Sequence, residues 1–343
     1  MDKNLKNKTF EQLRELVKSY DQQEYLAEYL FSFIHQRGVT DINQIMNLSK
    51  DFRSRLISDG YFISTIKKLD TFKDPDGTVK YLFELQDSRR IETVLLFDKK
   101  RTTLCISTQV GCAMGCKFCA TARLGFERNL SADEIVEQVN LVCNEGYNVT
   151  NLVYMGMGEP LLNYENVIKS VHILNHPKGR GIGLRRITIS TCGFPDKIKR
   201  LAKENLKPQL AVSLNAPNDK IRSKIIPIAE KQPLAELLDV VDYYNKNTGQ
   251  RVTFEYVMLA GVNDSDKCAK KLIKKVGKLN CKVNLIEFNP HPGCEFEPSL
   301  PTVIHRFAKL LNDKGIITTI CLKQGDTINA ACGQLGADRL KTG

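Results

Sequence analysis

From about residue 100 onward, seven apolar runs alternate with amphipathic stretches, and this alternation limits the possible folds more than any other feature. The apolar runs are rich in β-branched residues, as strands are: TLCIST, NLVYM, RRITIST, PQLAVSL, RVTFEYVML, KVNLIEF and GIITTICL. The stretches between them carry apolar residues at helical spacing: SADEIVEQVNLVC, YENVIKSVHILN, DKIKRLAKE, LAELLDVVDYYNK, DKCAKKLIKKVGKL and PTVIHRFAKLLNDK. Alternation of this kind predicts βαβ units and an α/β fold with a parallel sheet. A partial (β/α)6-type TIM barrel suits it, and pattern alone leaves a doubly wound sheet open.

The first 90 residues have a different pattern. FEQLRELV, YLAEYLFSFIHQRG and NLSKDFRSRL have helical spacing, with Ser49 placed to cap one helix and Gly38 placed to end another. TVKYLFEL and IETVLLF then resemble short strands. We therefore expect a small N-terminal helical domain over residues 1–90, ending in short strands, and a core domain over residues 91–343.

Composition and charge indicate where the protein acts and what kind of partner it binds. No apolar run approaches the length of a membrane span, and the polar start MDKNLKNKTFEQL lacks the apolar segment of a signal peptide, so we expect a cytoplasmic protein. The net charge of +11 favours a polyanionic partner, with nucleic acid ahead of a membrane surface. Basic stretches that suit phosphates are Lys99–Arg101, Lys178–Arg180, Arg185–Arg186 and Lys197–Arg200.

Three of the eleven cysteines, Cys112, Cys116 and Cys119, form a tight C-x3-C-x2-C group. One short loop can bring three such thiolates to one metal centre. Zinc would need a fourth ligand nearby, and the next histidine, His172, lies far along the chain. Chance clustering and a [4Fe–4S] cluster with one open iron are the other interpretations. The isolated cysteines are expected to be ordinary structural thiols: Cys143, Cys192, Cys268, Cys281, Cys294 and Cys321.

Polar residues follow the predicted strands at their carboxyl ends, where barrels carry their chemistry. They include Ser190, the Ser213–Asn215 stretch, Asn289 and Asp326, which precedes AACGQL. GMGEP follows NLVYM, and its glycines would let the backbone approach a ligand while Glu159 offers a carboxylate to an ammonium group. The sequence therefore predicts a site at this edge of the sheet.

The cysteine group, with Phe118 before its last member, resembles the signature of the radical S-adenosylmethionine (SAM) superfamily. The resemblance implies a [4Fe–4S] cluster held by Cys112, Cys116 and Cys119, with the amino and carboxylate groups of SAM on the open iron. GMGEP, with Gly158 and Glu159, resembles the superfamily's contact to the SAM amino group.

Further motifs extend the resemblance over nearly the whole chain. MGMGEPLLN, FNPHPG, AACGQL and the lone Cys105 resemble the RlmN/Cfr family of RNA adenine methyltransferases. The resemblance implies that Cys332 carries a methyl group, that Cys105 resolves the RNA adduct by forming a disulfide with Cys332, and that Glu92 accepts a proton. The residues it implies as SAM contacts, besides Gly158 and Glu159, are Ser190, Ser213, Leu214, Asn215 and Asn289.

Two thiols suit this chemistry. Carbon 2 of adenine is electron-poor and the SAM methyl group is an electrophile, so direct transfer is not feasible, but a thiolate can take the methyl first. The resemblance implies 2-methyladenosine as product, made by a ping-pong reaction that consumes two SAM molecules. The implied RNA targets are 23S rRNA, in the peptidyl-transferase centre, and tRNA, at the adenosine following the anticodon. A low-potential flavodoxin or ferredoxin would supply electrons, and we expect a monomer.

Two alternatives differ in chemistry. A Cfr-type enzyme would methylate carbon 8 of the same rRNA adenosine, although Pro160 in GMGEPLLN fits the carbon-2 branch better. A non-enzymatic zinc or iron–sulfur RNA-binding protein would leave Cys105 and Cys332 without a role.

Some positions depart from the family pattern. Asn215 stands where histidine is usual, and its amide can still donate and accept hydrogen bonds. The other departures fall on residues expected to affect the RNA side: Cys321 and Gln324 in place of arginines, Thr327 in place of aspartate, and Leu26 in place of arginine.

Overall fold

The computed structural model describes residues 2–321 and 323–341. Within these residues, seven parallel strands form the main part of one sheet and follow one another in chain order. They are β4 (Arg101–Cys105), β7 (Asn151–Tyr154), β8 (Ile187–Thr191), β9 (Gln209–Ser213), β10 (Val252–Met258), β11 (Cys281–Glu287) and β12 (Thr318–Cys321). All seven predicted strands are confirmed, although Leu322, the predicted end of the last, lies outside the described residues.

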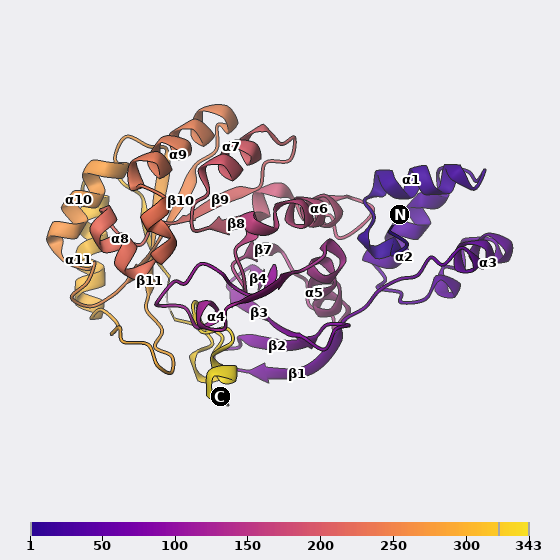
Figure 1. The fold of residues 1–343 in the computed structure, drawn as a ribbon, viewed down its shortest axis with the longest axis horizontal. Helices are drawn as coiled ribbons and strands as arrows, with labels where there is room; N and C mark the ends of the chain where they lie inside the picture. Colours follow the sequence, from indigo (N-terminus) through magenta and orange to yellow (C-terminus); the bar gives the residue numbers. More distant parts are fainter. Residues whose placement is uncertain (1, 322, 342–343) are drawn as a thin grey trace.

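Helices connect each parallel strand to the next and cover the outside of the sheet (Figure 1). They are α5 (Ala132–Asn144), α6 (Tyr164–Asn175), α7 (Pro195–Lys203), α8 (Asp219–Ile225) with α9 (Leu234–Thr248), α10 (Asp266–Val276) and α11 (Pro301–Asn312). Because the strand order never reverses, the sheet has no switch point of the doubly wound kind. The six βα units confirm a partial barrel, and it stays open between β4 and β12, which are not paired in the described part of the sheet.

Three antiparallel strands extend the sheet beyond β4. They are β1 (Lys67–Lys73), β2 (Val79–Glu84) and β3 (Arg90–Asp98). The sequence predicted β2 and β3 but not β1, because KKLDTFK is a largely exposed edge strand without apolar alternation. β2 and β3 pair across residue 90, so the sheet is continuous there, and the domain division at that residue stays a prediction.

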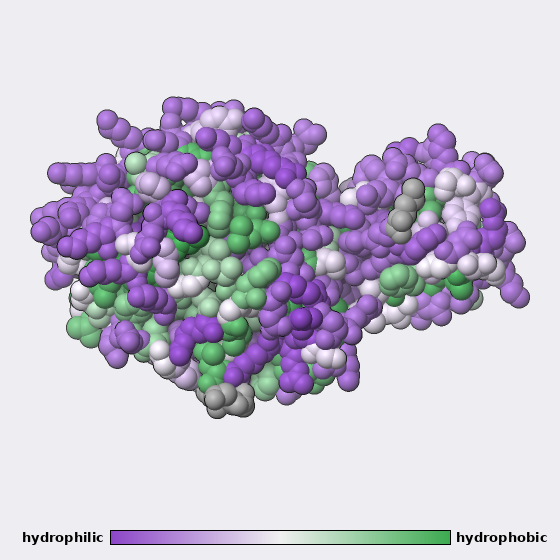
Figure 2. Space-filling view, viewed as in Figure 1, coloured by the Kyte–Doolittle hydropathy of each residue, from purple (hydrophilic) through white to green (hydrophobic). Residues whose placement is uncertain are grey.

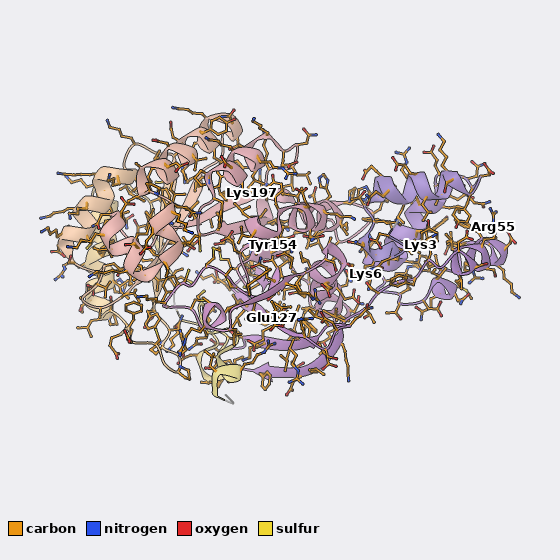
Figure 3. All side chains as sticks on the ribbon, viewed as in Figure 1. Lys3, Lys6, Arg55, Glu127, Tyr154 and Lys197 are labelled. Carbon is orange, nitrogen blue, oxygen red and sulfur yellow. The ribbon has the colours of Figure 1, made fainter. Side chains whose placement is uncertain are left out.

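The N-terminal lobe contains α1 (Phe10–Ser19), α2 (Leu26–His35) and α3 (Lys50–Ser58) at one end of the molecule (Figure 1). The predicted turn residues behave as expected: Ser49 caps α3 through a 3.2 Å bond from the Phe52 N–H, and Gly38 has a φ of +67° after α2. Lys6, between the lobe and α5 in Figure 3, forms a buried ion pair of 2.6 Å with Glu137. This pair fastens the lobe to the barrel.

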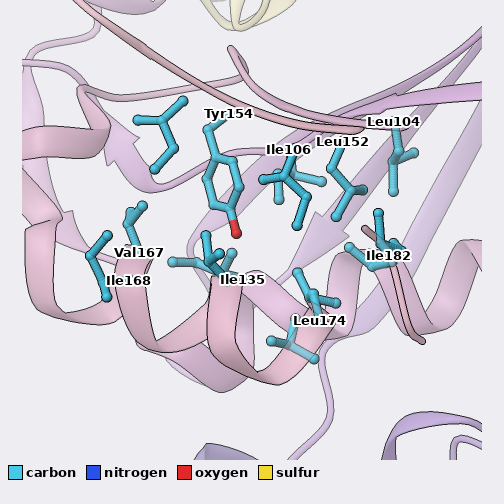
Figure 4. Close-up of a cluster of buried hydrophobic side chains, with 14 of the residues drawn as sticks. Leu104, Ile106, Ile135, Leu152, Tyr154, Val167, Ile168, Leu174 and Ile182 are labelled. Carbon is cyan, nitrogen blue, oxygen red and sulfur yellow. The ribbon is translucent and has the colours of Figure 1, made fainter. Parts of the chain in front are cut away.

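The core lies between the sheet and its outer helices. Figure 4 shows Leu104 and Leu152 from neighbouring strands above Leu174 of α6 and Ile182, while Tyr154 of β7 lies beside Val167 of α6. Hydrophilic side chains cover the lobe and outer helices in Figure 2, while apolar side chains come to the surface in the middle of the barrel face. None of the described helices is long and apolar enough to span a membrane.

Candidate active site

A small hairpin and a one-turn helix position the three-cysteine group. The predicted strand TLCIST leaves the sheet at Cys105, and β5 (Gln109–Gly111) then pairs with β6 (Phe126–Asn129), enclosing α4 (Ala120–Arg123). Gly111 has a φ of +72°, and a Cβ there would lie 1.8 Å from the Gly125 carbonyl oxygen, so only glycine fits. The Cys112 N–H donates to that same oxygen at 2.8 Å. The hairpin therefore fixes the start of the cysteine loop.

One cavity at the carboxyl ends of the strands contains most of the predicted site. Cys112, Cys116 and Cys119 form one part of its wall, and Cys332 reaches it from the C-terminal segment. The other predicted residues that line it are Gly158, Glu159, Ser190, Ser213 and Asn215. Leu214 is buried beside them without lining the cavity. Residues from separate βα units thus meet at the edge that the sequence predicted.

The three thiols belong to one short loop and line the same cavity. A [4Fe–4S] cluster binds each thiolate through a different iron, so thiols spaced around a cavity fit it. Burial raises the pKa of Cys112 and of Cys119, and a cationic centre would offset that cost. Cys112, Cys116 and Cys119 are thus the residues that would hold the cluster.

Glu159 lines the same cavity and is held there by two backbone hydrogen bonds. Its carboxylate accepts hydrogen bonds from the Leu161 N–H at 3.0 Å and the Cys192 N–H at 2.7 Å. Gly158 has a φ of +102°, and a Cβ there would lie 2.5 Å from the Cβ of Gln109. Burial raises the pKa of Glu159, and it forms no ion pair with a described lysine or arginine. A buried carboxylate open to a cavity suits a ligand ammonium group, the part expected of SAM.

Asn215 lines the cavity and also stabilises the turn that follows β9. It has a φ of +56°, a region that asparagine tolerates better than most residues. Its Oδ1 accepts from the Val257 N–H at 2.8 Å, and its carbonyl accepts from the Asn263 side chain at 2.8 Å. Asn215, which stands where the family usually has histidine, therefore stabilises the turn after β9 through its side-chain amide.

A second cavity lies at the open side of the barrel, and Cys332 lines both cavities. Cys105, Asn289 and Cys321 line the second one. The side-chain amide of Asn289 donates to the Cys332 carbonyl at 3.1 Å, while its buried Oδ1 has no hydrogen-bond partner among the described residues. Burial raises the pKa of Cys105 to about 12, whereas Cys332 is exposed on the C-terminal segment. None of the eleven cysteines, all of them described, forms a disulfide.

Glu92 contacts the C-terminal segment but lines neither cavity. Its carboxylate accepts from the Gly336 N–H at 3.1 Å and lies 3.9 Å from the Lys80 ammonium group. Lys80 also pairs with Asp338 at 2.8 Å. Burial raises the pKa of Glu92. This carboxylate anchors the segment that carries Cys332.

The structure adds residues that the sequence did not point out. Glu255 of β10 lines the first cavity and accepts from the Asn284 side chain at 2.8 Å, and burial raises its pKa to about 7. Cys192 lies 3.7 Å, sulfur to sulfur, from Cys116. The fully buried Arg222 donates to the Cys192 carbonyl at 2.7 Å. Two sequence features could have indicated these residues: a glutamate inside the apolar run RVTFEYVML and a cysteine directly after a predicted strand.

Two of the basic stretches converge at the amino ends of the strands. A polar hollow there is bordered by five cations, none of which forms an ion pair with a described carboxylate: Lys100, Arg101, Arg185, Arg186 and Lys282. The other stretches are partly neutralised, because Lys178 pairs with Glu28 and Arg200 pairs with Glu165.

A partial barrel with three cysteines in the loop after its first strand defines a radical SAM enzyme, and residues 106–272 match the family described as the Radical SAM superfamily. Residues 3–60 match the ribosomal RNA large subunit methyltransferase N-terminal domain. A crystal structure of a radical SAM methyltransferase from Sphaerobacter thermophilus has a TM-score of 0.91 and 41% identity, covering 98% of this chain and 100% of that one.

Relatives that match this chain over nearly their full length show which family of the superfamily it belongs to. The probable dual-specificity RNA methyltransferase RlmN of Dictyoglomus thermophilum is 42% identical, covering 99% of this chain and 98% of its own. The protein of that name from Thermotoga sp. strain RQ2 is 44% identical, covering 99% of each chain. The chain therefore belongs to the RlmN family of radical SAM methyltransferases, which confirms the resemblance drawn from its motifs.

Proposed function

We propose that this protein forms 2-methyladenosine in 23S rRNA, in the peptidyl-transferase centre, and in tRNA, at the adenosine following the anticodon. The observation that carries the proposal is the position of Cys332, which lines both the cavity with the three-cysteine group and the cavity with Cys105. One thiol can therefore meet SAM on one side and a resolving thiol on the other. The names of the relatives support the choice of RNA and its dual specificity.

Cys332 would act first, as a thiolate that takes a methyl group from one SAM molecule. When bound at Cys112, Cys116 and Cys119, the reduced cluster would cleave a second SAM and supply the carbon radical that activates this methyl group. Glu159 would hold the SAM ammonium group, with Gly158, Ser190, Ser213, Leu214, Asn215 and Asn289 as its other proposed contacts. Cys105 would then release the product by forming a disulfide with Cys332.

Glu92 is the proton acceptor in this proposal on the strength of the resemblance. Its buried carboxylate has a raised pKa, so it can hold a proton nearer neutral pH, and it contacts Gly336 on the Cys332 segment. The target adenine would have to leave its stack to reach the cavity, as base-modifying enzymes require.

The partners follow from the surface and the chemistry. The five-cation hollow would meet RNA phosphates, and the lobe within residues 1–90 would engage the RNA as a separate unit from the core of residues 91–343. The remaining proposed features are a monomer that acts in the cytoplasm and receives electrons from a low-potential flavodoxin or ferredoxin.

Nucleoside mass spectrometry after an anaerobic reaction tests the proposal. The reconstituted enzyme, SAM and a reductant would be incubated with unmodified 23S rRNA fragment or tRNA in separate tubes. 2-Methyladenosine in both tubes is the expected result. 8-Methyladenosine would move the protein to the Cfr-type branch, and 5′-deoxyadenosine without methylated RNA would overturn the proposed substrate.

A further inference from the structure

The second cavity contains three thiols where the proposed reaction needs two. Cys105 and Cys332 are the proposed resolving pair, and Cys321 lines the same cavity. No motif links Cys321 to them, since it lies on the last predicted strand at a position where the family usually has arginine. The fold brings it there because the open side of the barrel lies between β4 and β12.

The three thiols differ in how the chain holds them. Cys105 is the last residue of β4, and Cys321 is the last residue of β12, where it pairs in register with Ile286 of β11. Cys332 instead lies on an irregular segment between two short 3-10 helices, Asp326–Ile328 and Ala337–Lys341. Two thiols at strand ends thus line the same cavity as one thiol on an irregular segment.

We propose that Cys321 is an exchange thiol, which takes the disulfide with Cys332 over from Cys105. The Cys321 thiol loses its proton and attacks the sulfur of Cys332 in the Cys105–Cys332 disulfide. The Cys321–Cys332 bond forms, the Cys105–Cys332 bond breaks, and the Cys105 thiolate takes up a proton, so no electrons are gained or lost. A dithiol reductant then reduces the new disulfide and is itself oxidised to a disulfide.

The surroundings of Cys332 support this step. Cys321 and Cys105 both raise the pKa of Cys332, as neighbouring anions would, and both line the same cavity as Cys332. Cys332 itself is exposed and Cys321 is partly exposed, so a disulfide between them is open to an external reductant. The inference rests on the proposed function for one element, the disulfide between Cys105 and Cys332.

Disulfide mapping on the intact, cluster-loaded protein tests the exchange without relying on methylation. The protein would be treated anaerobically with oxidised glutathione, quenched in acid, alkylated, digested and analysed for cross-linked peptides. We expect both Cys105–Cys332 and Cys321–Cys332 peptides from the unaltered chain. Cys105→Ser should leave only the second, Cys321→Ser only the first, and Cys143→Ser, at a cysteine outside both cavities, should leave both.

The outcomes separate this inference from the proposed function. A Cys105–Cys332 peptide without any Cys321–Cys332 peptide, in both the unaltered chain and Cys105→Ser, overturns the exchange and leaves the resolving pair standing. Absence of both peptides overturns both ideas. Methylation kinetics provide a second test. In Cys321→Ser with a dithiol reductant, the ratio of the steady-state to the single-turnover methylation rate should fall several-fold. An unchanged ratio contradicts the exchange.

Discussion

The carboxylate of Glu159 accepts a hydrogen bond from the backbone N–H of Cys192, at 2.7 Å, and so joins two βα loops on one wall of the cavity. A second bond, from Leu161, fixes the other oxygen. Glu159→Gln removes the charge and replaces one acceptor with a donor. We expect SAM to bind the cluster-loaded protein on the order of tenfold more weakly, as measured anaerobically by equilibrium dialysis. Glu127→Gln, at an exposed carboxylate outside the cavity, is the matched control, and equal affinity in the two variants would contradict the role of Glu159.

Loss of one cluster ligand should remove the cluster. Cys112→Ala takes away one of the three thiols of the first cavity, and we expect a colourless protein without cluster iron or SAM cleavage. Iron analysis, visible absorbance and assay of 5′-deoxyadenosine measure the three effects. Cys143→Ala lies outside both cavities and should keep all three. Full methylation by Cys112→Ala would end the radical interpretation.

Removal of the resolving thiol should trap the RNA. Without the Cys105 thiol, the proposed adduct on Cys332 lacks its resolving thiol, and Cys321 is proposed to act only on the finished disulfide, so Cys105→Ala should leave RNA covalently bound to the protein. A denaturing gel with labelled RNA detects this species, and Cys105→Ala combined with Cys332→Ala should abolish it. Free methylated product at the normal rate from Cys105→Ala would contradict its assigned role.

Glu255 should make stability depend on pH. Burial raises its pKa from the ordinary 4.5 to about 7, so between these values the folded chain keeps a proton that the unfolded chain releases. The stabilisation is complete below the lower value and is lost as the pH rises through the higher one. Glu255→Gln should therefore flatten the fall in unfolding free energy over this range, by up to about 1.4 kcal/mol per pH unit.

Urea denaturation of the anaerobic protein at several pH values measures this slope. Glu236→Gln, at an exposed position on α9, should keep the slope of the unaltered chain. Equal slopes for all three proteins would show that Glu255 ionises as it does in water.

The five-cation hollow should contribute to RNA affinity through charge. Arg185→Glu combined with Arg186→Glu removes two of its cations, and should weaken RNA binding and lower the slope of log affinity against log salt by about two. Fluorescence anisotropy at several salt concentrations measures both. Arg200→Glu is the control, because Glu165 already neutralises that arginine. The same loss in the control would mean that net charge, not the hollow, is responsible.

Local patterns were enough to predict the seven parallel strands, because each is an apolar run bounded by an amphipathic helix. They were also enough for the three-cysteine group and for GMGEP, whose spacing is short. β1 escaped prediction because it gains its strand conformation from pairing with β2, not from its own polar sequence. The places of Glu255 and Cys321 in the two cavities were not predicted. Their neighbours there come from other strands, which lie far away in the sequence.

The anchoring of the Cys332 segment has a consequence for how the chain folds. Glu92 and Gly336 are 244 residues apart, and Lys80 and Asp338 are 258 residues apart. Contacts this distant in sequence form late, because the entropy of closing the loop must be met first. The contacts that fix the Cys332 segment are therefore expected to close after the strands of the barrel have paired, so the proposed methyl carrier is the last part of the site to be placed.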